Sequence, residues 1–317
     1  MHIDWEEHRL LYRIAQAYYV DGQTQQEVAR RLGLSRPKVS RLLQRARDAH
    51  IVNITLVPPS GGITEVEQEL EARYGLEEAV LVAVSDETDS DRVATELGPA
   101  AAECLLRCVN DGDTIGLAWG RTVLAMVDAL PVHPLSEATV VQLNGGLGPV
   151  GELEHSAELA RRAAQKLNAR LRLIPAPGIV SSVAAANALR ADYQISEVLT
   201  LAAHADVAVV GLGVPTAASV LLRDGRIITP ADLEALERAG AVGDVLLRYI
   251  GAEGTPVDLE LDQRIVGLTL EQLAAIPRVI GVAGGVVKRR VIRAVLNAGL
   301  LDVLVTDQAT GETLLKS

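Results

Sequence analysis

The sequence predicts two folds in one chain, an N-terminal all-α helix-turn-helix domain and a C-terminal, mostly parallel α/β domain. Two observations predict them. The first fifty residues contain three helical hydrophobic patterns and are basic, although the whole 317-residue chain carries a formal charge of −11. After Gly75, short apolar runs alternate with longer helical patterns, which is typical of a parallel sheet covered by helices.

The charge is distributed unevenly along the chain. The first fifty residues hold nine Lys or Arg and six Asp or Glu, whereas the remaining 267 residues hold 21 and 35. Between Val28 and Arg47 there are seven basic residues and no acidic one. A small basic module joined to a large acidic body is typical of a DNA-reading domain attached to a ligand-binding or assembly domain.

The first two helices are predicted from hydrophobic spacing and from their end signals. Residues 5–20 place apolar side chains at spacings of three and four, which indicates a helix. Thr24 and Glu27 have the spacing of a capping box, so a second helix is expected to begin there. Gly33 is expected to end it in a left-handed turn.

A third helix is expected after Ser35, which would cap it, with Pro37 in its first turn. Two short helices joined by a tight glycine turn, the second rich in Arg and Ser at its start, predict a helix-turn-helix whose second helix enters the major groove. Double-stranded operator DNA is therefore the expected partner. The candidate DNA-binding residues are Ser35, Arg36, Lys38, Ser40, Arg41 and Arg45.

The boundary between the two domains follows from composition. Residues 51–57 read as one short strand, and the Pro and Gly residues after them indicate a linker. A connecting helix is expected from Thr64, with a capping box formed with Glu67. The predicted division is a DNA-binding domain at 1–57, a linker at 58–63, and an effector-binding and oligomerisation domain at 64–317.

Seven apolar runs predict the strands of the second domain. In parallel sheets ligands bind beyond the carboxyl ends of the strands, and several of these runs end in Gly, Asn or Asp. The predicted strands are residues 79–84, 114–118, 139–143, 171–174, 207–210, 279–282 and 303–305.

Three of these strand ends carry residues suited to an anion or a sugar. Glycine lets the backbone approach a ligand, free N–H groups at a helix start attract anions, and Arg or Lys adds a cation. The carboxylate of Asp244 could bind sugar hydroxyls. The residues at the three ends are Gly120, Arg121 and Thr122; Asn144, Gly145 and Gly146; and Gly284, Gly285 and Lys288.

Other functions have weaker support. Residues 146–151 match G-x-G-x-x-G, but Pro149 removes a donor and no acidic residue follows the next strand to hold a ribose, so a dinucleotide site is not expected. The histidines lack metal spacing, and no G-x-S-x-G or Walker pattern occurs. No catalytic residue, metal or cofactor is predicted. Cys104 and Cys108 are expected to be buried small hydrophobic residues.

Membrane insertion and export are not expected either. The longest apolar stretches are far shorter than the roughly 20 residues that span a bilayer. The first residues are acidic, where a signal peptide needs a basic segment and an apolar run. The sequence therefore predicts a cytoplasmic protein with no membrane partner.

Taken in order, the motifs resemble those of the SorC family of sugar-responsive bacterial transcription regulators, over nearly the whole chain. The matching stretches are residues 25–35, Trp119-Gly-Arg-Thr122, Gln142-Leu-Asn-Gly-Gly146, 173–177, 240–244, 276–285 with Lys288, and 305–307.

The resemblance implies a winged-type helix-turn-helix followed by a domain like the sugar-phosphate isomerases, assembled as dimers and tetramers. It also implies a phosphorylated sugar or related metabolite, such as a polyol, as effector. The residues that would contact it are Gly120, Arg121, Thr122, Asn144, Gly145, Gly146, Asp244 and Lys288. Residues 248–253 depart from the aromatic pair and Asp common in the family, which leaves the effector type open. An isomerase-like enzyme with a DNA-binding arm is the alternative, and a carboxylate and histidine pair near the glycine loops would distinguish it.

Overall fold

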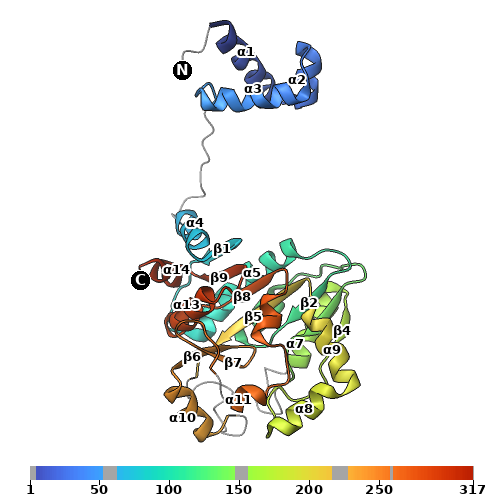
Figure 1. Cartoon of the computed structure of the whole chain (residues 1–317), viewed down its shortest axis with the longest axis vertical. Helices are drawn as coiled ribbons and strands as arrows, with labels where there is room; N and C mark the ends of the chain where they lie inside the picture. The colour runs from blue at the N-terminus through green and yellow to red at the C-terminus, as the bar shows by residue number, and fades with distance from the viewer. Residues whose placement is uncertain (1–4, 53–62, 147–155, 216–227, 258–259, 317) are drawn as a thin grey trace. The chain divides into compact units, whose positions relative to one another are not determined.

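The structure, a computed structural model, describes residues 5–52, 63–146, 156–215, 228–257 and 260–316. The chain forms two compact units, residues 1–60 and 61–317 (Figure 1).

The small unit is a bundle of three helices around one core. α1 (Trp5–Ala15) continues as a π-helix (Gln16–Val20), and α1 and α2 (Gln25–Leu32) both pack against α3 (Arg36–Asp48). The predicted helices are therefore present. The core side chains are Leu11, Ile14, Val28, Val39, Leu42 and Leu43, with alanines between them.

The helix ends of this unit agree with those predicted from the sequence, except at Ser35. The Thr24 hydroxyl accepts from the Glu27 N–H, and the Glu27 carboxylate accepts from the Thr24 N–H at 2.8 Å, which confirms the capping box. Gly33 has the predicted left-handed backbone, with φ of +67°. Ser35 occupies the N-cap position of α3, but its side chain makes no capping hydrogen bond, so that part of the prediction was wrong.

The strand expected at residues 51–57 is not formed by the two residues that the structure describes. Ile51 and Val52 lie in a bend and pack against the core of the small unit. Burying these two side chains explains their apolar character without a sheet. Residues 53–57, like most of the predicted linker, lie outside the described residues, and so does the side chain of Thr64.

The large unit is a nine-stranded sheet with helices on both faces. Its strands are β1 (Glu78–Val82), β2 (Thr114–Leu117), β3 (Thr139–Gln142), β4 (Arg170–Arg172), β5 (Val207–Gly213), β6 (Ala241–Val245), β7 (Arg248–Gly251), β8 (Val279–Val282) and β9 (Val303–Asp307). Its helices are α4 (Ile63–Tyr74), α5 (Ser90–Cys108), α6 (Arg121–Ala129), α7 (Ser156–Leu167), α8 (Val183–Ala191), α9 (Tyr193–Ala203), α10 (Pro230–Arg238), α11 (Glu260–Gln263), α12 (Leu270–Ala274), α13 (Arg289–Asn297) and α14 (Gln308–Leu315).

Seven strands run parallel in the order β1-β9-β8-β5-β2-β3-β4, which confirms the predicted sheet. From β2 the chain proceeds outward through β3 to β4, and from β5 it proceeds the other way through β8 to β9. The order therefore reverses between β2 and β5. In such sheets a ligand crevice forms at the carboxyl ends of the two strands that flank the reversal.

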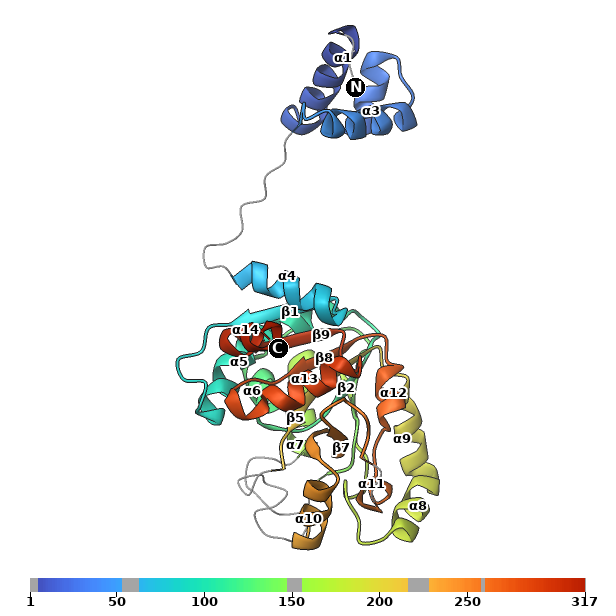
Figure 2. The same cartoon turned by 60° about the vertical axis from the view of Figure 1, so that its left-hand side comes forward.

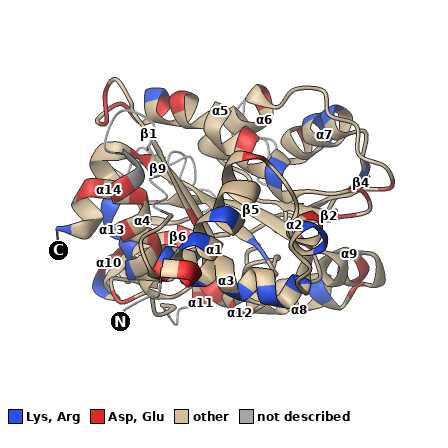
Figure 3. Ribbon diagram, turned by 90° about the horizontal axis from the view of Figure 1, so that it is seen from above, with Lys and Arg blue, Asp and Glu red and all other residues tan. Residues whose placement is uncertain are grey.

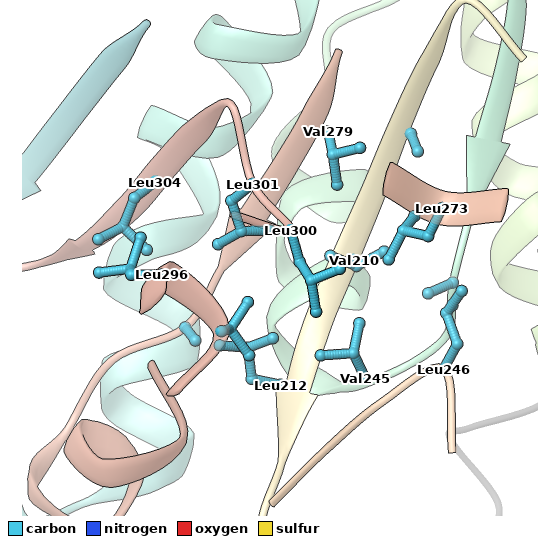
Figure 4. Close-up of a cluster of buried hydrophobic side chains, with 14 of the residues drawn as sticks. Val210, Leu212, Val245, Leu246, Leu273, Val279, Leu296, Leu300, Leu301 and Leu304 are labelled. Carbon is cyan, nitrogen blue, oxygen red and sulfur yellow. The ribbon is translucent and has the colours of Figure 1, made fainter. Parts of the chain in front are cut away.

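Two cores, one on each face, hold the helices to the sheet. Alternate residues of β5 point to opposite faces: Ala208 and Val210 join the core beneath α9, α12, α13 and α14, whereas Val207 and Val209 join the core beneath α5, α6 and α7. Figure 4 shows the first core, with Val210 and Leu212 near Val245 and Leu246. Cys104 is buried in the second core and Cys108 is half-buried, both as free thiols.

A hairpin that the sequence did not predict is added to the end of β5. β6 pairs antiparallel with β5, and β7 pairs antiparallel with β6 (Figure 1). The two-residue turn consists of Leu246 and Leu247, whose φ angles are +54° and +71°. Positive φ at both turn residues matches the twist of a tight hairpin but costs free energy for non-glycine residues. Both side chains are buried, and that burial offsets the strain.

α4 covers one edge of the sheet, beside β1 and α14 (Figures 1 and 2). The outward N–H groups of Ala79 and Leu81 donate to the carboxylates of Glu71 and Glu67 at 2.9 and 2.8 Å. Tyr74 binds the carbonyl of Leu314 in α14. The carboxylates of a helix thus satisfy backbone groups that a further strand would otherwise pair with.

Candidate functional site

The predicted ligand residues lie at one edge of the sheet. Gly120–Thr122 follow β2, Asn144–Gly146 follow β3, and Gly284–Lys288 follow β8. Because these strands and β5 are parallel neighbours, their carboxyl ends meet. β5 extends beyond its pairing with β2, which ends where Val209 lies opposite Leu117, and continues to Gly213. The hairpin pairs with this extension of β5, so Asp244 lies at the same edge of the sheet.

Asp244 lies directly over Gly213, its partner across the β5–β6 ladder. A β-carbon added to Gly213 would come within 2.0 Å of the Asp244 Oδ1 atom. The carboxylate is buried and accepts one hydrogen bond, from the Leu247 N–H at 3.2 Å. Burial raises the pKa of Asp244 to about 6, against the opposing effects of that hydrogen bond and of the Lys288 charge.

The charge of Lys288 acts on this carboxylate and lowers its pKa. Lys288 lies in the one-turn 3₁₀ helix (Val286–Lys288) that follows the glycine loop, and it stands at the N-cap of α13. Burial, followed by the charge of Arg121, lowers the pKa of Lys288 to about 8, and Asp244 opposes that shift. Its ammonium forms no ion pair or hydrogen bond with the residues that the structure describes.

Arg121 and Thr122 begin α6, as predicted, but both have partners within the protein. The Arg121 guanidinium donates to the Asp91 carboxylate at 2.7 Å, and both side chains are largely exposed. The Thr122 hydroxyl donates to the Val282 carbonyl of β8 at 2.7 Å and is buried. An anion can displace the exposed Asp91 from Arg121, whereas Thr122 ties the start of α6 to the sheet.

The Gly284-Gly285 loop is held by a residue outside the predicted site, Asp307. Its carboxylate accepts the Gly285 N–H at 2.6 Å and the Thr310 N–H of α14 at 2.8 Å. A β-carbon on Gly284 would lie 2.5 Å from the same carboxylate. Asp307 therefore fixes the glycine loop that precedes Lys288, and only the Val305-Thr-Asp307 match pointed to it in the sequence.

Asn144 has a buried side chain whose amide nitrogen and oxygen both lack a partner among the residues that the structure describes. Its neighbour Gly145 passes so close to Pro177 that a β-carbon would lie 2.7 Å from the Pro177 carbonyl oxygen. An unpaired buried amide is costly, so the position suits a ligand that supplies a donor and an acceptor. Gly146 is bridged to Pro177, and the rest of the G-x-G-x-x-G match lies outside the described residues.

Gly213 was not among the predicted site residues, although it decides where Asp244 can lie. We expect Gly213→Ala to displace the Asp244 carboxylate and to lower the free energy of unfolding by about 1 to 3 kcal/mol, as overpacking commonly does. Gly251→Ala is the matched control, because a β-carbon on Gly251 would make only ordinary contacts, at 3.7 Å or more. Urea denaturation of both variants checks this, and equal stabilities would contradict it.

The two pKa shifts predict how stability depends on pH. The folded-state pKa of Asp244 lies above its ordinary value of 3.8, so the free energy of unfolding is expected to fall as pH rises from about 4 to about 6. The folded-state pKa of Lys288 lies below 10.5, so stability is expected to rise from about pH 8 to 10.5. Asp244→Asn should flatten the first change and Lys288→Met the second. Urea denaturation midpoints of each variant and of wild type, measured across this pH range, check the prediction. Variant profiles that match the wild-type profile would refute it.

The candidate DNA-binding residues lie on α3 and at its N-cap, and Lys and Arg recur along α2 and α3 (Figure 3). Ser35, Arg36, Lys38, Ser40 and Arg41 are all exposed. Arg45 differs from the others because it forms an ion pair with Glu7 of α1 at 2.5 Å. The N-terminal half of α3 thus presents the free polar surface, while Arg45 joins two helices.

The large unit matches a protein-family profile, and nearly the whole chain matches known proteins. A family profile described as "Putative sugar-binding domain" matches residues 59–316, and the profile of sigma-70 region 4, a helix-turn-helix, matches residues 13–49. The full-length sorbitol operon regulator SorC of Klebsiella pneumoniae has a similar structure, with a TM-score of 0.74 and 28% identity over 98% of this chain and 99% of that one. The chain belongs to the SorC family of sugar-binding transcriptional regulators.

Relatives of this SorC-family chain are named as regulators. The transcriptional regulator LsrR of Klebsiella pneumoniae is 33% identical over 98% of this chain and 93% of its own length. The deoxyribonucleoside regulator of Bacillus subtilis is 30% identical over 98% and 99%. These matches confirm the predicted family and fold class and favour regulation over the enzyme alternative.

The described parts of this regulator contain no group of three His, Cys, Asp or Glu residues that could hold a metal ion. Among the described helices, none is long and apolar enough to cross a membrane.

Proposed function

We propose that this SorC-family regulator changes its affinity for operator DNA when a phosphorylated sugar or a related metabolite binds at the carboxyl ends of β2, β3, β5 and β8. The observation that carries the proposal is that the charges of Asp244 and Arg121 both act on Lys288, beside the point where the strand order reverses. Arg121 is more than a hundred positions from Asp244 and Lys288 in the sequence, and the fold brings the charges of Arg121 and Asp244 within reach of Lys288.

Each residue has a separate role in the proposal. Lys288, which has no ion-pair partner among the described residues, binds the phosphate together with Arg121 once Asp91 is displaced. The free N–H groups at the start of α6 add to the attraction, because a helix N-terminus favours anions. Asp244 accepts hydrogen bonds from sugar hydroxyls, and the Asn144 amide binds a further polar group of the ligand.

The overall charge explains why these local groups are needed. Residues 51–317 hold 35 acidic and 21 basic residues, so the large unit repels an anionic metabolite at long range. Lys288, which has no ion-pair partner among the described residues, supplies the attraction at short range. The names of relatives mention sorbitol and deoxyribonucleosides, so a neutral sugar or polyol is the main competing effector class.

One observation favours the enzyme alternative, the raised pKa of Asp244. A carboxylate with a pKa of about 6 is suited to remove a proton beside a carbonyl, which is the first step of sugar-phosphate isomerisation. Incubation of the protein with aldose and ketose phosphates in D₂O, followed by NMR, tests this function. Deuterium incorporation that Asp244→Asn abolishes would establish the enzyme. Its absence, with ligand binding intact, supports the regulator.

A thermal-shift screen tests the proposed effector class most directly. A ligand that binds only the folded state raises the melting temperature, by an amount set by its concentration relative to Kd. Pairs of phosphorylated and free sugars and polyols at equal concentration are the appropriate panel. We expect stabilisation by a phosphorylated member and much less by its free form. Equal stabilisation by both would assign the site to a neutral sugar.

We also propose that the regulator works as a homo-oligomer. One helix-turn-helix makes few base contacts, and domains of this kind usually pair on two half-sites. Light scattering at micromolar concentration, with and without DNA, should give a mass of at least twice 33.7 kDa. A monomer under both conditions would contradict this.

A further inference from the structure

The segment that joins β1 to the first turn of α5 is acidic. Residues 85–91 hold four Asp or Glu and no Lys or Arg, and we call them the acidic segment. The carboxylates of Asp86 and Asp89 accept hydrogen bonds from groups within three residues of them. The other two carboxylates, those of Glu87 and Asp91, bind arginines from distant parts of the chain.

Those two arginines begin the helices that follow the glycine loops of the candidate site. Arg121 is the first residue of α6, and Arg289 is the first residue of α13. Asp91 accepts a hydrogen bond from the Arg121 guanidinium at 2.7 Å, and Glu87 forms an ion pair with Arg289. A helix N-terminus attracts anions. The acidic segment therefore places a carboxylate of the protein itself at the start of both helices.

The two ion pairs are not equally exposed. The side chains of Glu87 and Arg289 are 36% and 22% exposed, and the Glu87 carbonyl also accepts the Val286 N–H at 3.2 Å. The side chains of Asp91 and Arg121 are 78% and 48% exposed, and the Asp91 carboxylate accepts no other hydrogen bond from the described residues. Exposed ion pairs contribute little stability. Glu87 therefore anchors the acidic segment, whereas Asp91 can release Arg121 at a small cost.

Close helix packing keeps Asp91 beside Arg121. α5 and α6 approach so closely that a β-carbon on Gly98 would lie 2.6 Å from the Ala125 carbonyl oxygen. The two helices cannot slide along each other without a clash at this point. Asp89, not Asp91, caps α5, so the Asp91 carboxylate is not needed to begin the helix. It is therefore held within reach of Arg121 whether or not a ligand is bound.

We propose that Asp91 is a built-in competitor of the anionic effector. In the unliganded protein its carboxylate is bound to the Arg121 guanidinium, which an effector phosphate would otherwise bind. The inference rests on the proposed function, because it assumes that Arg121 takes part in anion binding. A phosphate that also reaches Lys288 displaces the carboxylate once its concentration is high enough. The free energy lost with the ion pair is subtracted from the affinity, so Asp91 raises the effector concentration at which the regulator responds.

Titration of the full chain with inorganic phosphate tests the competitor. The rise in melting temperature with phosphate concentration gives Kd, at an ionic strength fixed with sodium chloride. Asp91→Asn keeps the size of the side chain and removes its charge, and it should lower Kd about fivefold. The matched control is Glu103→Gln, which removes the same charge from an exposed residue further along α5 and should leave Kd within about 1.5-fold of wild type.

A double-mutant cycle shows whether Asp91 acts through Arg121. In the Arg121→Gln background, where the cation is absent, adding Asp91→Asn should change Kd by less than about twofold. A general electrostatic or purely structural role of Asp91 would instead give the same tightening with or without Arg121. Such equal tightening, or no tightening by Asp91→Asn alone, would overturn the proposal.

Lys288→Ala separates this inference from the proposed function. It should weaken phosphate binding whether or not Asp91 competes, because Lys288 binds the anion in the proposed function. Weakening by Lys288→Ala without tightening by Asp91→Asn would leave the anion site in place and overturn the competitor. No saturable effect of phosphate on either wild type or Asp91→Asn would overturn both.

Discussion

The triple variant Arg36→Ala, Lys38→Ala, Arg41→Ala is expected to lose at least about a hundredfold in affinity for operator DNA. A base contact made by Arg contributes about 1 to 3 kcal/mol, and a phosphate contact adds a salt-dependent attraction. The three side chains are exposed on the N-terminal half of α3, so their removal leaves the core of the small unit intact. Fluorescence anisotropy with an operator selected from a random DNA library measures the change.

A matched variant separates direct contact from general electrostatics. Arg172→Ala, Arg238→Ala, Arg290→Ala makes the same change in net charge but removes exposed residues of the large unit. It should retain nearly full affinity. Unchanged binding by the α3 variant, shown folded by circular dichroism, would refute the DNA-reading role of this helix. Arg36→Ala alone should also relax base preference, whereas Arg45→Ala should weaken all sequences alike, in part because it breaks the ion pair with Glu7.

Lys288→Ala is expected to weaken binding of a phosphorylated effector by about ten- to a hundredfold. A hydrogen bond between an ammonium and a phosphate contributes about 1.5 to 3 kcal/mol, which corresponds to that range in Kd. DNA binding without effector should persist, because residues 36–48 belong to the other compact unit. Calorimetric titration with the effector found by thermal shift, and with its unphosphorylated form, measures both affinities.

The control for this variant is Arg290→Ala, which removes an exposed cation two residues further along the chain. It should leave Kd within about twofold of wild type. Since the pKa of Lys288 is about 8, binding of the phosphorylated form should also weaken as pH rises through 8. If wild type bound both forms equally well, or if Lys288→Ala bound the phosphorylated form normally, the phosphate role of Lys288 would be wrong.

The sequence predicted the parallel strands because each is a short apolar run between helical patterns, and burial on both faces makes that pattern unambiguous. It missed the β6–β7 hairpin for a definite reason. Tight hairpins are normally signalled by Asn-Gly or similar turns, and here the turn is Leu246-Leu247. Tertiary burial of the two leucines replaces the missing local preference, and no local pattern shows it.

Local sequence patterns also revealed only part of the candidate site. Glycines and cations at strand ends are visible in the sequence, so Gly120, Gly284 and Lys288 could be predicted. Partners could not, because they come from distant segments: Asp91 for Arg121, the Val282 carbonyl for Thr122, and Glu7 for Arg45. Gly213 and Asp307 were missed as site residues because their roles depend on which side chain crosses them in space.

The carboxylates of Glu67 and Glu71 have a consequence for aggregation. They occupy the two outward N–H groups of β1 that a strand from another molecule would bind first. A fragment that begins at Gly75 would keep the whole sheet but expose an unpaired, mostly apolar edge, whereas one that begins at Ile63 would keep it closed. α4 therefore keeps the β1 edge of the sheet from pairing with a neighbouring molecule, and cleavage after Tyr74 would open that edge to such pairing.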